Sequence, residues 1–598
     1  MSPIPQRLQQ LRVAMQQQGF DAVLIPSSDP HLSEYLPAHW QGREYFSGFT
    51  GSVATLIVTQ DFAGCWVDSR YWSQAENELA GTGVTMMKTH SAAATVYIEW
   101  LVQTLPAHSV LSVDGKVLGL ATARALRSGL EEKSIVLNTD HDVLSTVWEN
   151  RPSLPTASVF EHAPPFASTS RAEKLAMLRK AMRDKAADWH FISTVDDIAW
   201  LLNLRGSDVS YNPVFIAHAL IGIDSATLFI QAEKVPAAIR SALAQENIQL
   251  ADYHSAAKAL AQLPQDAKLL IDPRRITDGF KQAIATHVQI KESLNPTVLM
   301  KSRKTDAEVA CVRTAMEQDG AALCEFFSWL EDSLGKTSIT EITIDEQICA
   351  ARARQAHFIS PSFGTIAGFN ANGAMPHYRA TAESHAVIEG DGLLLIDSGG
   401  QYLNGTTDIT RVVGIGQVSP AQKRDFTLVL KGMIALSRMR FPRGTYSTSL
   451  DTIARAPMWA HGINYGHGTG HGVGFFLNVH EGPQSISGAI PDANMVMEAG
   501  MITSDEPGIY RPGKWGVRIE NLLLCTPAAK LEHGEFGEFL EFETLTLCPI
   551  DTRCMEITLL DQTEKDWINT YHAMVQQRLS TRLTGAALHW LETRTQAI

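Results

Sequence analysis

The chain has 598 residues, too many for a single hydrophobic core, so about two to four domains are expected. With 45% hydrophobic and 19% charged residues, its composition is that of an ordinary globular protein, and no apolar run approaches the ~18 residues that span a bilayer. Acidic residues outnumber Lys and Arg by 64 to 50, for a net charge of −14, which argues against a nucleic-acid partner bound through phosphate neutralisation.

The first segment predicts an α/β module. Leu8, Leu11 and Met15 have helical spacing within a polar N-terminal stretch that lacks the apolar core of a secretion signal. Strand-like runs follow at "DAVLIP", "VATLIVT" and "GCWVDS", and a polar helix is expected to begin near Tyr71. A stretch rich in Pro, Ser and Ala, residues 149–170, indicates a linker.

The same order of elements then begins again. A charged helix over residues 171–187 precedes the strand "DWHFIST", the short helix "VDDIAWLLNLRGSD" and the strand pair "VFIAHALIGI" and "ATLFIQ". Asp29 in "SSDPHLSEYL" even has a counterpart in Asp196 of "TVDDIAWLLN". We therefore predict two related α/β modules, over residues 1–155 and 156–297, although their sequence identity is low.

The third segment, residues 298–598, differs from the first two. Long helices are predicted over 305–333 and 340–356, followed by glycine-rich hairpins and a late helix over 563–580. An α+β domain is therefore expected. It is also the predicted catalytic domain, because carboxylates, histidines and glycines concentrate in residues 377–520.

The cysteines indicate the cellular compartment. An odd, dispersed set without a CxxC pair fits buried thiols in a reducing environment better than a disulfide framework. A cytoplasmic location is therefore predicted. The seven cysteines are Cys65, Cys311, Cys324, Cys349, Cys525, Cys548 and Cys554.

Two acids lie on what the pattern predicts to be facing strands. "GLLLIDSGG" is an apolar run ending in Asp397 and a Gly-Gly turn, and "GTTDITRVVGIG" is the expected return strand. On it Asp408 would share a face with Thr406 and Thr410. Asp397 could instead serve the turn. If both acids do face an apolar interior, they would repel each other, and a bound cation would relieve the cost.

A second pair of acids repeats this arrangement. In "MITSDEPGIYRPGKWGVRIENLLLC", Glu506 and Glu520 are predicted on two strands joined by Pro-Gly turns. Arg518 would share a face with Glu520, and could pair with it or reach a substrate carbonyl. Four carboxylates and a histidine suit Mn²⁺, Co²⁺ or Zn²⁺ in a two-metal site better than Ca²⁺, which disfavours imidazole.

The histidines lie in "GHGTGHGVG", residues 466–474. His467 and His471 have the spacing of a helical HExxH motif, but each glycine would cost a helix about 1 kcal/mol relative to alanine. The position of the required Glu is Gly468, and a GxGxxG nucleotide motif does not fit either. A glycine-dense loop beside a crowded centre is expected, with one imidazole binding metal and the other serving its surroundings or the substrate.

Taken in order, Asp397, Asp408, His471, Glu506 and Glu520 resemble the dimetal ligand set of the "pita-bread" metallopeptidases. This family includes methionine aminopeptidase, prolidase and aminopeptidase P. The chain is most similar to its three-domain cytosolic aminopeptidase P group, the Xaa-Pro aminopeptidases. The similarity covers nearly the whole chain, through "REYFSGFTGS", "VDSRYW", "WLLNLRGSDVSYNPVF", "LIDSGGQYLNGTTDITR", "GHGTGHGVG", "NVHEGP", "DEPGIY", "GVRIENL" and "FLEFETLTLCPIDT".

The resemblance implies two creatinase-N-terminal-like α/β modules followed by a pita-bread catalytic domain. It implies that Asp397 binds one metal, that Asp408 and Glu520 bridge both, and that His471 and Glu506 complete the other. A water between the metals would be the nucleophile. Two divalent ions are expected, Mn²⁺ first, with Zn²⁺ or Co²⁺ as alternatives; no other cofactor is implied.

The resemblance also implies roles for groups around the metals. Glu506 would be the general base and His480 would stabilise the oxyanion or hold substrate. His377 and His467 would contact substrate or move protons, and Arg518 would lie behind the ligands. The expected reaction is removal of the first residue of a peptide with proline second, by a homodimer. Tyr510, Phe475 and Phe476 could line the slot for the proline ring, or equally belong to the core.

Two other functions remain open at this stage. Prolidase shares the ligand set but cleaves dipeptides, and the two additional modules argue against it. A non-catalytic pita-bread binding module is the other alternative, but such a protein has no need of an intact ligand set.

Overall fold

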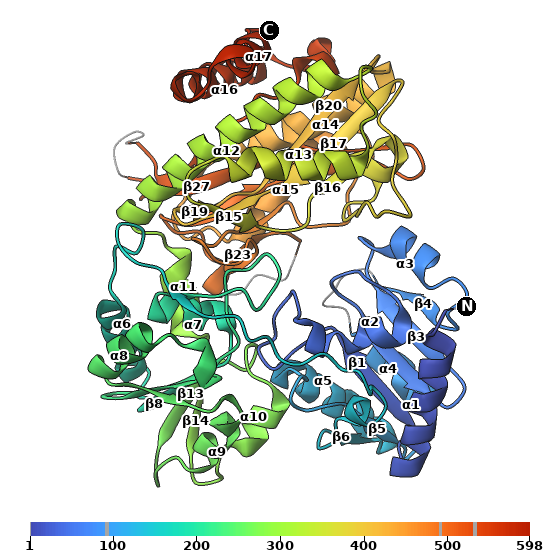
Figure 1. Ribbon diagram of the computed structural model, residues 1–598, viewed down its shortest axis with the longest axis vertical. Helices are drawn as coiled ribbons and strands as arrows, with labels where there is room; N and C mark the ends of the chain where they lie inside the picture. The colour runs from blue at the N-terminus through green and yellow to red at the C-terminus, as the bar shows by residue number, and fades with distance from the viewer. Residues whose placement is uncertain (1, 90–94, 489–492, 530–534) are drawn as a thin grey trace. The chain divides into compact units, whose positions relative to one another are not determined.

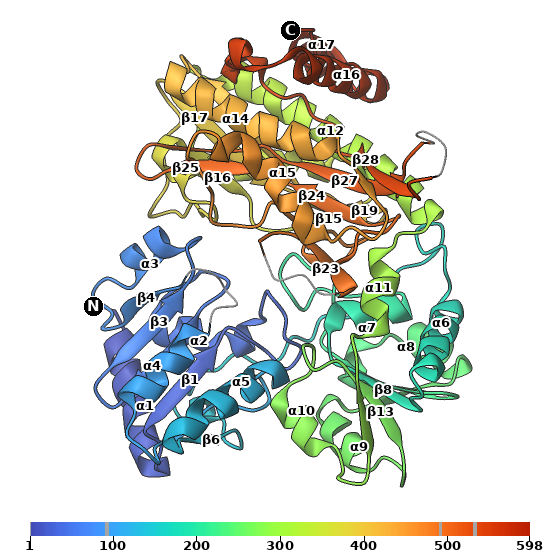
Figure 2. The same ribbon diagram turned by 180° about the vertical axis from the view of Figure 1, so that it is seen from behind.

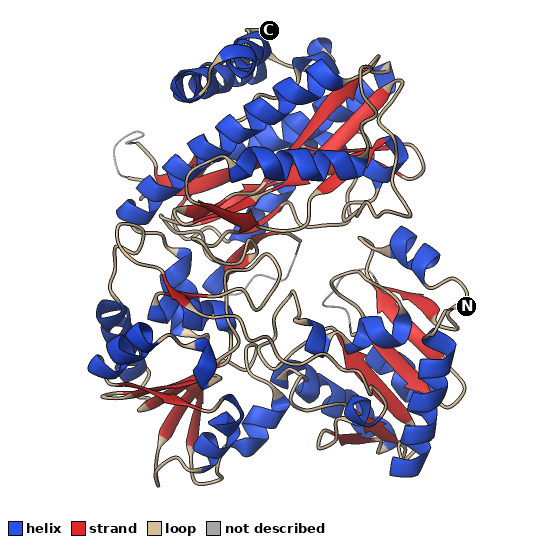
Figure 3. Ribbon diagram, in the orientation of Figure 1, coloured by secondary structure: helices blue, strands red, loops and turns tan. Residues whose placement is uncertain are grey.

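The structure is a computed structural model that describes residues 2–89, 95–488, 493–529 and 535–598. It divides into two compact units, residues 1–163 with 169–298, and residues 164–168 with 299–598. In both units helices lie outside the sheets (Figures 1 and 3). The domain limits predicted from composition, at 155/156 and 297/298, stay predictions.

The first unit begins with a six-stranded sheet in the order β4-β3-β2-β1-β5-β6. Strand β1 pairs antiparallel with β2 and parallel with β5, so the sheet is mixed. Its strands are β1 (Ala22–Pro26), β2 (Thr55–Thr59), β3 (Ala63–Val67), β4 (Thr85–Lys88), β5 (Val110–Ser112) and β6 (Val136–Asn138). Its helices are α1 (Ile4–Gln18), α2 (Gly42–Ser47), α3 (Trp72–Glu78), α4 (Val96–Thr104) and α5 (Leu120–Leu130).

The continuous apolar sequence of β1 has a direct cause. Val23 and Ile25 point into one hydrophobic cluster, whereas Ala22 and Leu24 point into another on the opposite face. Successive side chains of a strand alternate between faces, so a strand covered on both sides has no polar positions.

A second sheet repeats the topology of the first, in the order β12-β11-β10-β8-β13-β14. As in the first, the central strand pairs antiparallel with one neighbour and parallel with the other. The strands are β8 (Trp189–Ile192), β10 (His218–Gly222), β11 (Ala226–Phe229), β12 (Ile248–Ala251), β13 (Lys268–Ile271) and β14 (Gln289–Glu292). The helices are α6 (Arg171–Asp184), α7 (Val195–Leu202), α8 (Ala237–Gln245), α9 (Ala256–Ala261) and α10 (Asp278–Ala283). Strands β7 (Phe160–Glu161) and β9 (Leu204–Arg205) pair separately. The prediction of two related α/β modules is confirmed.

The second unit is α+β, as predicted. Its helices are α12 (Asp306–Ser333), α13 (Glu341–Ala353), α14 (Pro420–Ser437), α15 (Ser447–Trp459), α16 (Gln562–Leu579) and α17 (Gly585–Arg594); α11 (Pro296–Ser302) begins just before it. The predicted helices differ from α12, α13 and α16 by at most three residues at either end. Helix α12 begins where expected because Thr305 and Glu308 form a capping box.

The strands of this unit form separate sheets. Strands β16 (Ile366–Phe369), β17 (Gly392–Ser398) and β20 (Ile409–Ile415) make one antiparallel sheet. A second, in the order β21-β28-β27-β24-β22-β23, contains β21 (Arg440–Pro442), β22 (Gly470–Gly472), β23 (Glu481–Ile486), β24 (Ile502–Asp505), β27 (Asn521–Pro527) and β28 (Phe539–Thr544). Smaller groups are β15 (Phe358–Pro361) with β18 (Gly400–Tyr402) and β19 (Gly405–Thr406), and β25 (Gly508–Arg511) with β26 (Trp515–Arg518).

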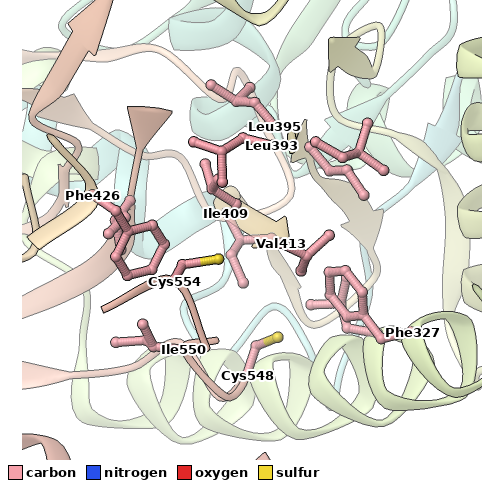
Figure 4. Packing of buried hydrophobic residues seen from close by; sticks show 14 of the residues in the cluster. Phe327, Leu393, Leu395, Ile409, Val413, Phe426, Cys548, Ile550 and Cys554 are labelled. Carbon is pink, nitrogen blue, oxygen red and sulfur yellow. The ribbon is translucent and has the colours of Figure 1, made fainter. Parts of the chain in front are cut away.

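The unit has a large hydrophobic core, with smaller clusters around strands β24, β27 and β28. Helix α14 packs against α15 and contacts β24 and β28, and α16 contacts α12 and α14 (Figure 2). The segment before α16 contributes Cys548 and Ile550 to this core. They lie in one cluster with Leu393 of β17, Val413 of β20 and Phe327 of α12 (Figure 4). The C-terminal segment therefore contributes to the core beneath the sheets.

Two further observations bear on the sequence analysis. All seven cysteines are unpaired, and five of them are buried. Within the described ranges, each helix is either too short or too polar to cross a lipid bilayer.

Candidate metal centre

The five predicted ligands all come from the second unit. Asp397 lies in β17 and His471 in β22, whereas Asp408, Glu506 and Glu520 lie next to strand ends. The predicted facing strands are confirmed, since β17 pairs antiparallel with β20 and β24 pairs antiparallel with β27. Of the four acids, however, only Asp397 lies within its strand, and the other three are the residue next to a strand end. Short strands that were not predicted, β18 and β19 in one case and β25 and β26 in the other, lie between the facing strands.

Three of the predicted ligands form a compact cluster. Asp408, His471 and Glu520 each offer a ligand atom, and these atoms lie within 4.8 Å of one another. His471 Nε2 lies 3.5 Å from Asp408 Oδ2 and 3.4 Å from Glu506 Oε1. Four residues that are far apart in the sequence therefore face a common point.

The hydrogen bonding of His471 fits a metal ligand. Its Nδ1 lies 2.9 Å from the carbonyl oxygen of Gly472, which can only accept, so Nδ1 carries the proton. Its Nε2 then faces the carboxylates of Asp408 and Glu506. One imidazole nitrogen and carboxylate oxygens that converge in this way suit a divalent cation, and a backbone carbonyl on the other nitrogen is the usual support of a metal-binding histidine.

The carboxylates are crowded. Burial, followed by repulsion from neighbouring acids, raises the pKa of Asp408 and of Glu520 well above the usual range. Burial likewise raises the pKa of Glu506 to about 7, with Arg518 acting in the opposite direction. Oδ1 of Asp397 is buried without a hydrogen-bond partner in the described structure. Four acids and one imidazole in this state fit divalent cations, which would relieve both the repulsion and the missing partner.

Glycines allow the histidine strand to approach its neighbours. A Cβ at Gly470 would lie 1.9 Å from the Ser504 carbonyl oxygen, and one at Gly472 would lie 2.1 Å from that of Glu481. Neither position could hold a larger residue without moving backbone. The predicted close approach of backbones is confirmed, but residues Gly470–Gly472 form a paired strand rather than the expected loop.

Arg518 binds Asp397, an acid that the sequence analysis did not name as its partner. Its Nη2 donates to Asp397 Oδ2 at 2.5 Å and to the Pro376 carbonyl at 3.3 Å, and its Nη1 donates to the Tyr510 hydroxyl at 2.7 Å. Glu520 instead accepts from the Thr410 hydroxyl at 2.8 Å. Arg518 therefore supports a predicted ligand, Asp397, through a hydrogen bond to its carboxylate.

The other histidines differ in their surroundings. His467 Nδ1–H donates to the Gly468 carbonyl at 2.8 Å, and its Nε2 lies 2.8 Å from the Tyr510 hydroxyl. The ring of His480 stands edge-on to that of His471, with centroids 4.3 Å apart. His377 follows Pro376, whose carbonyl Arg518 binds. His467 thus contacts the Tyr510–Arg518 pair.

Sequence reasoning did not find the roles of three polar groups at this centre. Thr410 binds Glu520, the Ser504 hydroxyl lies 3.2 Å from Glu506 Oε1, and Tyr510 joins His467 to Arg518. Thr410 was placed on the face of Asp408 and Tyr510 was offered as a wall of the proline slot, whereas no signal singled out Ser504. The aromatic pair offered as a proline slot lies in the core, with Phe475 4% and Phe476 0% exposed.

Family models match four parts of the chain. Residues 310–527 match metallopeptidase family M24, and residues 538–598 match the C-terminal region of peptidase M24. Residues 7–144 and 150–308 each match the creatinase/prolidase N-terminal domain. The fold and the site together define a metallopeptidase preceded by two creatinase-type modules.

Individual relatives cover the whole chain. It is 36% identical to a probable Xaa-Pro aminopeptidase P of Ajellomyces dermatitidis, over 100% of both chains. It is also 36% identical to aminopeptidase P2 of Arabidopsis thaliana, over 97% of this chain and 86% of that protein. A crystal structure of an X-prolyl aminopeptidase from Caenorhabditis elegans, a cytosolic enzyme with a di-nuclear active site, matches with a TM-score of 0.94 and 30% identity over 100% of both chains. This protein belongs to metallopeptidase family M24, in its aminopeptidase P group.

Proposed function

We propose that this protein is an Xaa-Pro aminopeptidase, which hydrolyses the bond between the first residue of a peptide and a proline in second position. The proposal rests on the cluster of Asp408, His471 and Glu520, whose ligand atoms lie within 4.8 Å of one another. Glu506 lies beside it, with Oε1 3.4 Å from His471 Nε2. Relatives named Xaa-Pro aminopeptidase P, matched over the full chain, supply the substrate class.

The five predicted ligands would hold two divalent ions. Asp397 would bind one ion, Asp408 and Glu520 would bridge the two, and His471 and Glu506 would complete the other. When bound, the ions supply a water that ionises near neutral pH and polarise the scissile carbonyl. Mn²⁺ is the proposed metal because carboxylates dominate the set, with Zn²⁺ or Co²⁺ as alternatives.

Glu506 and His480 are the proposed proton-transfer and carbonyl-binding groups. With a pKa of about 7 before any cation binds, Glu506 can exchange a proton near neutral pH, and the Ser504 hydroxyl orients it. The edge-on contact of His480 with His471 places its imidazole beside the ligands, where it can donate to a developing oxyanion.

A second layer of side chains would orient these groups and the substrate. Arg518 fixes the Asp397 carboxylate and the Tyr510 hydroxyl, and that hydroxyl reaches His467. His467 would act on the substrate through this chain of hydrogen bonds, and His377 would contact the peptide from the neighbouring loop. Because His467 contacts Tyr510 whereas His471 faces Asp408 and Glu506, we propose that His467 acts on the substrate and that His471 binds metal.

The two rival functions have weaker support. An Xaa-Pro dipeptidase from Bacillus anthracis matches 64% of this chain with a TM-score of 0.50 and 22% identity, which shows a common fold alone. A non-catalytic binding module would not need the complete acid and histidine set. An aminopeptidase is therefore the function that the site favours.

We further propose a cytoplasmic homodimer. The unpaired cysteines favour a reducing compartment, and the Caenorhabditis elegans enzyme with the same overall fold is described as cytosolic. The dimer rests on family resemblance, and light scattering of the purified protein tests it.

Peptide cleavage followed by mass spectrometry tests the function. Purified protein should remove arginine from an Arg-Pro-Pro peptide in the presence of Mn²⁺, lose this activity with a chelator, and recover it when Mn²⁺ is returned. Asp408→Ala is the matched control and should stay inactive throughout. Metal-loaded protein that leaves this peptide intact contradicts the proposal, and faster cleavage of the Gly-Pro dipeptide would favour a dipeptidase.

A further inference from the structure

Arg411 of β20 places its guanidinium in the interior of the second unit, where the residue is 3% exposed. Its N–H groups have six acceptors, all neutral oxygen atoms. They are the Pro549 carbonyl at 3.2 Å, the Thr410 carbonyl at 3.0 Å, the Glu520 carbonyl at 2.6 Å, Asn521 Oδ1 at 2.8 Å, the Cys548 carbonyl at 2.9 Å and the Tyr571 hydroxyl at 2.9 Å. A buried cation satisfied in this way fixes the position of every group around it.

One side of this cage holds a proposed metal ligand. Arg411 binds the carbonyls of both Thr410 and Glu520, and the Glu520 amide donates to the Thr410 carbonyl at 3.1 Å. The Thr410 hydroxyl in turn donates to Glu520 Oε2 at 2.8 Å. Arg411 therefore holds the main chain of Thr410 and of Glu520, the two residues whose side chains form the hydrogen bond that orients the Glu520 carboxylate.

The opposite side of the cage belongs to the C-terminal segment. Tyr571 of α16 is 3% exposed, accepts from Arg411, and can donate its proton to the Thr546 carbonyl at 3.0 Å or the Cys548 carbonyl at 3.0 Å. The next residue, His572, accepts from the Ile550 amide at 3.1 Å. Helix α16 thus shapes the segment that carries two of the acceptors of Arg411.

We propose that Tyr571 is a positioning residue of the metal centre: through Arg411 it holds Glu520 in the orientation that binds metal. The C-terminal region, residues 538–598, would then help to orient a metal ligand, in addition to its contribution to the hydrophobic core. The proposal rests on the proposed function, because it takes Glu520 to be a metal ligand. Groups that orient metal ligands from behind are worth about 10- to 100-fold in affinity or activity.

A simple packing role for Tyr571 predicts a different outcome. Its ring is part of the main hydrophobic core and stacks on Trp567 with centroids 5.2 Å apart. If the ring alone matters, removing the hydroxyl would lower stability without changing metal affinity. The two roles are separated by a variant that keeps the ring.

The test compares Tyr571→Phe with Tyr402→Phe. Tyr402 is also buried in this unit, and its hydroxyl donates to Asp319 Oδ1 at 2.9 Å, away from the proposed ligands. For each full-length protein, the Mn²⁺ dissociation constant of the metal-free form is measured by calorimetry, and its thermal transition is recorded. We expect Tyr571→Phe to raise the dissociation constant about tenfold and Tyr402→Phe to leave it within about twofold, with similar losses of thermal stability.

Unchanged Mn²⁺ affinity in Tyr571→Phe overturns the proposal, even if the rate of peptide cleavage falls. An equal loss of affinity in Tyr402→Phe also overturns it, because the effect would then be general destabilisation. If Tyr571→Phe does not fold, Arg411→Lys gives the same reading, since an ammonium cannot reach six acceptors. The wild type separates the two proposals: failure of the wild type to bind Mn²⁺ or to cleave peptide refutes the proposed function itself.

Discussion

Each unit of this protein contains a cluster of histidines, and the two clusters differ in what faces them. In the first unit, His31 and His218 stack with centroids 4.5 Å apart, and Tyr253 stacks on His218 at 4.9 Å. His31 Nδ1–H donates to the Ser193 carbonyl at 2.7 Å, and its Nε2 lies 2.9 Å from the Tyr253 hydroxyl. These imidazoles are neutral and have neutral partners.

In the second unit, His471 faces two carboxylates instead. An imidazole that is fully satisfied by a carbonyl and a hydroxyl has nothing left to give to a cation. His471, whose Nε2 lies near Asp408 and Glu506, is placed to share a cation with these acids. The comparison teaches that the partners of a buried histidine, rather than its burial, separate a structural role from a ligand role.

Replacing His471 should produce the largest effect. His471→Ala removes the nitrogen directed at Asp408 and Glu506, so we expect loss of bound metal and a fall in kcat of at least about 1,000-fold. His467→Ala should retain metal and lose roughly 100-fold in kcat, within the usual range for a proton-transfer group. Elemental analysis and kinetics on an Xaa-Pro peptide check both. Equal loss of metal in the two variants would show that their division of roles is wrong.

Removal of metal should destabilise one unit only. Chelation leaves the crowded carboxylates of the second unit uncompensated, whereas Asp208 near the histidine cluster of the first unit is already paired with Lys234. A metal at 100 times its dissociation constant stabilises the form that binds it by about 2.7 kcal/mol. In differential scanning calorimetry, addition of a chelator should therefore lower the temperature of one unfolding transition and leave the other unchanged. A shift of both transitions, or of neither, is the contrary result.

Deleting the Tyr510 hydroxyl should have a smaller effect on the rate. Tyr510→Phe breaks the link between His467 and Arg518 but leaves the ligands in place. We expect kcat to fall about tenfold with unchanged metal content, the lower end for a group that supports others. The exposed Tyr446, changed to Phe, is the matched control. Loss of metal from Tyr510→Phe would mean that Tyr510 supports the ligands rather than His467.

Acid should weaken the first unit through its neutral histidines. Burial lowers the pKa of His31 and lowers that of His218 well below its usual value of 6.5. Below pH 6.5 the unfolded chain therefore binds protons that the folded chain does not, and stability falls as pH falls. A difference of one proton changes the free energy of unfolding by about 1.4 kcal/mol per pH unit.

His218→Phe keeps the ring stack and removes one titrating group. The pH dependence of unfolding by urea between pH 7 and 5 should therefore be shallower in this variant than in the wild type, with equal curves above pH 7 apart from a constant offset. The nearby charges that act on His31 are Asp29, Asp208 and Lys234. An identical slope in both proteins would show that His218 is protonated in the folded state.

How far the sequence could be read depended on the range of the contacts. The α/β modules and long helices followed from local periodicity, and the capping box of Thr305 and Glu308 marks the start of α12 within four residues. The hairpins carrying the acids were only partly predicted, because short insertions such as β18–β19 have no strong local pattern. Phe475 and Phe476 could not be assigned from sequence, since burial depends on distant segments.

The sequence alone determined which residues can carry the chemistry: four acids and a histidine in a family order, with glycines where backbones must pass closely. Only the tertiary structure decided what orients them. Arg518 reaches Asp397 across 121 positions of sequence, and Arg411 reaches Tyr571 across 160. Such contacts leave no periodicity behind, because they are set by the packing of sheets and helices rather than by neighbouring residues.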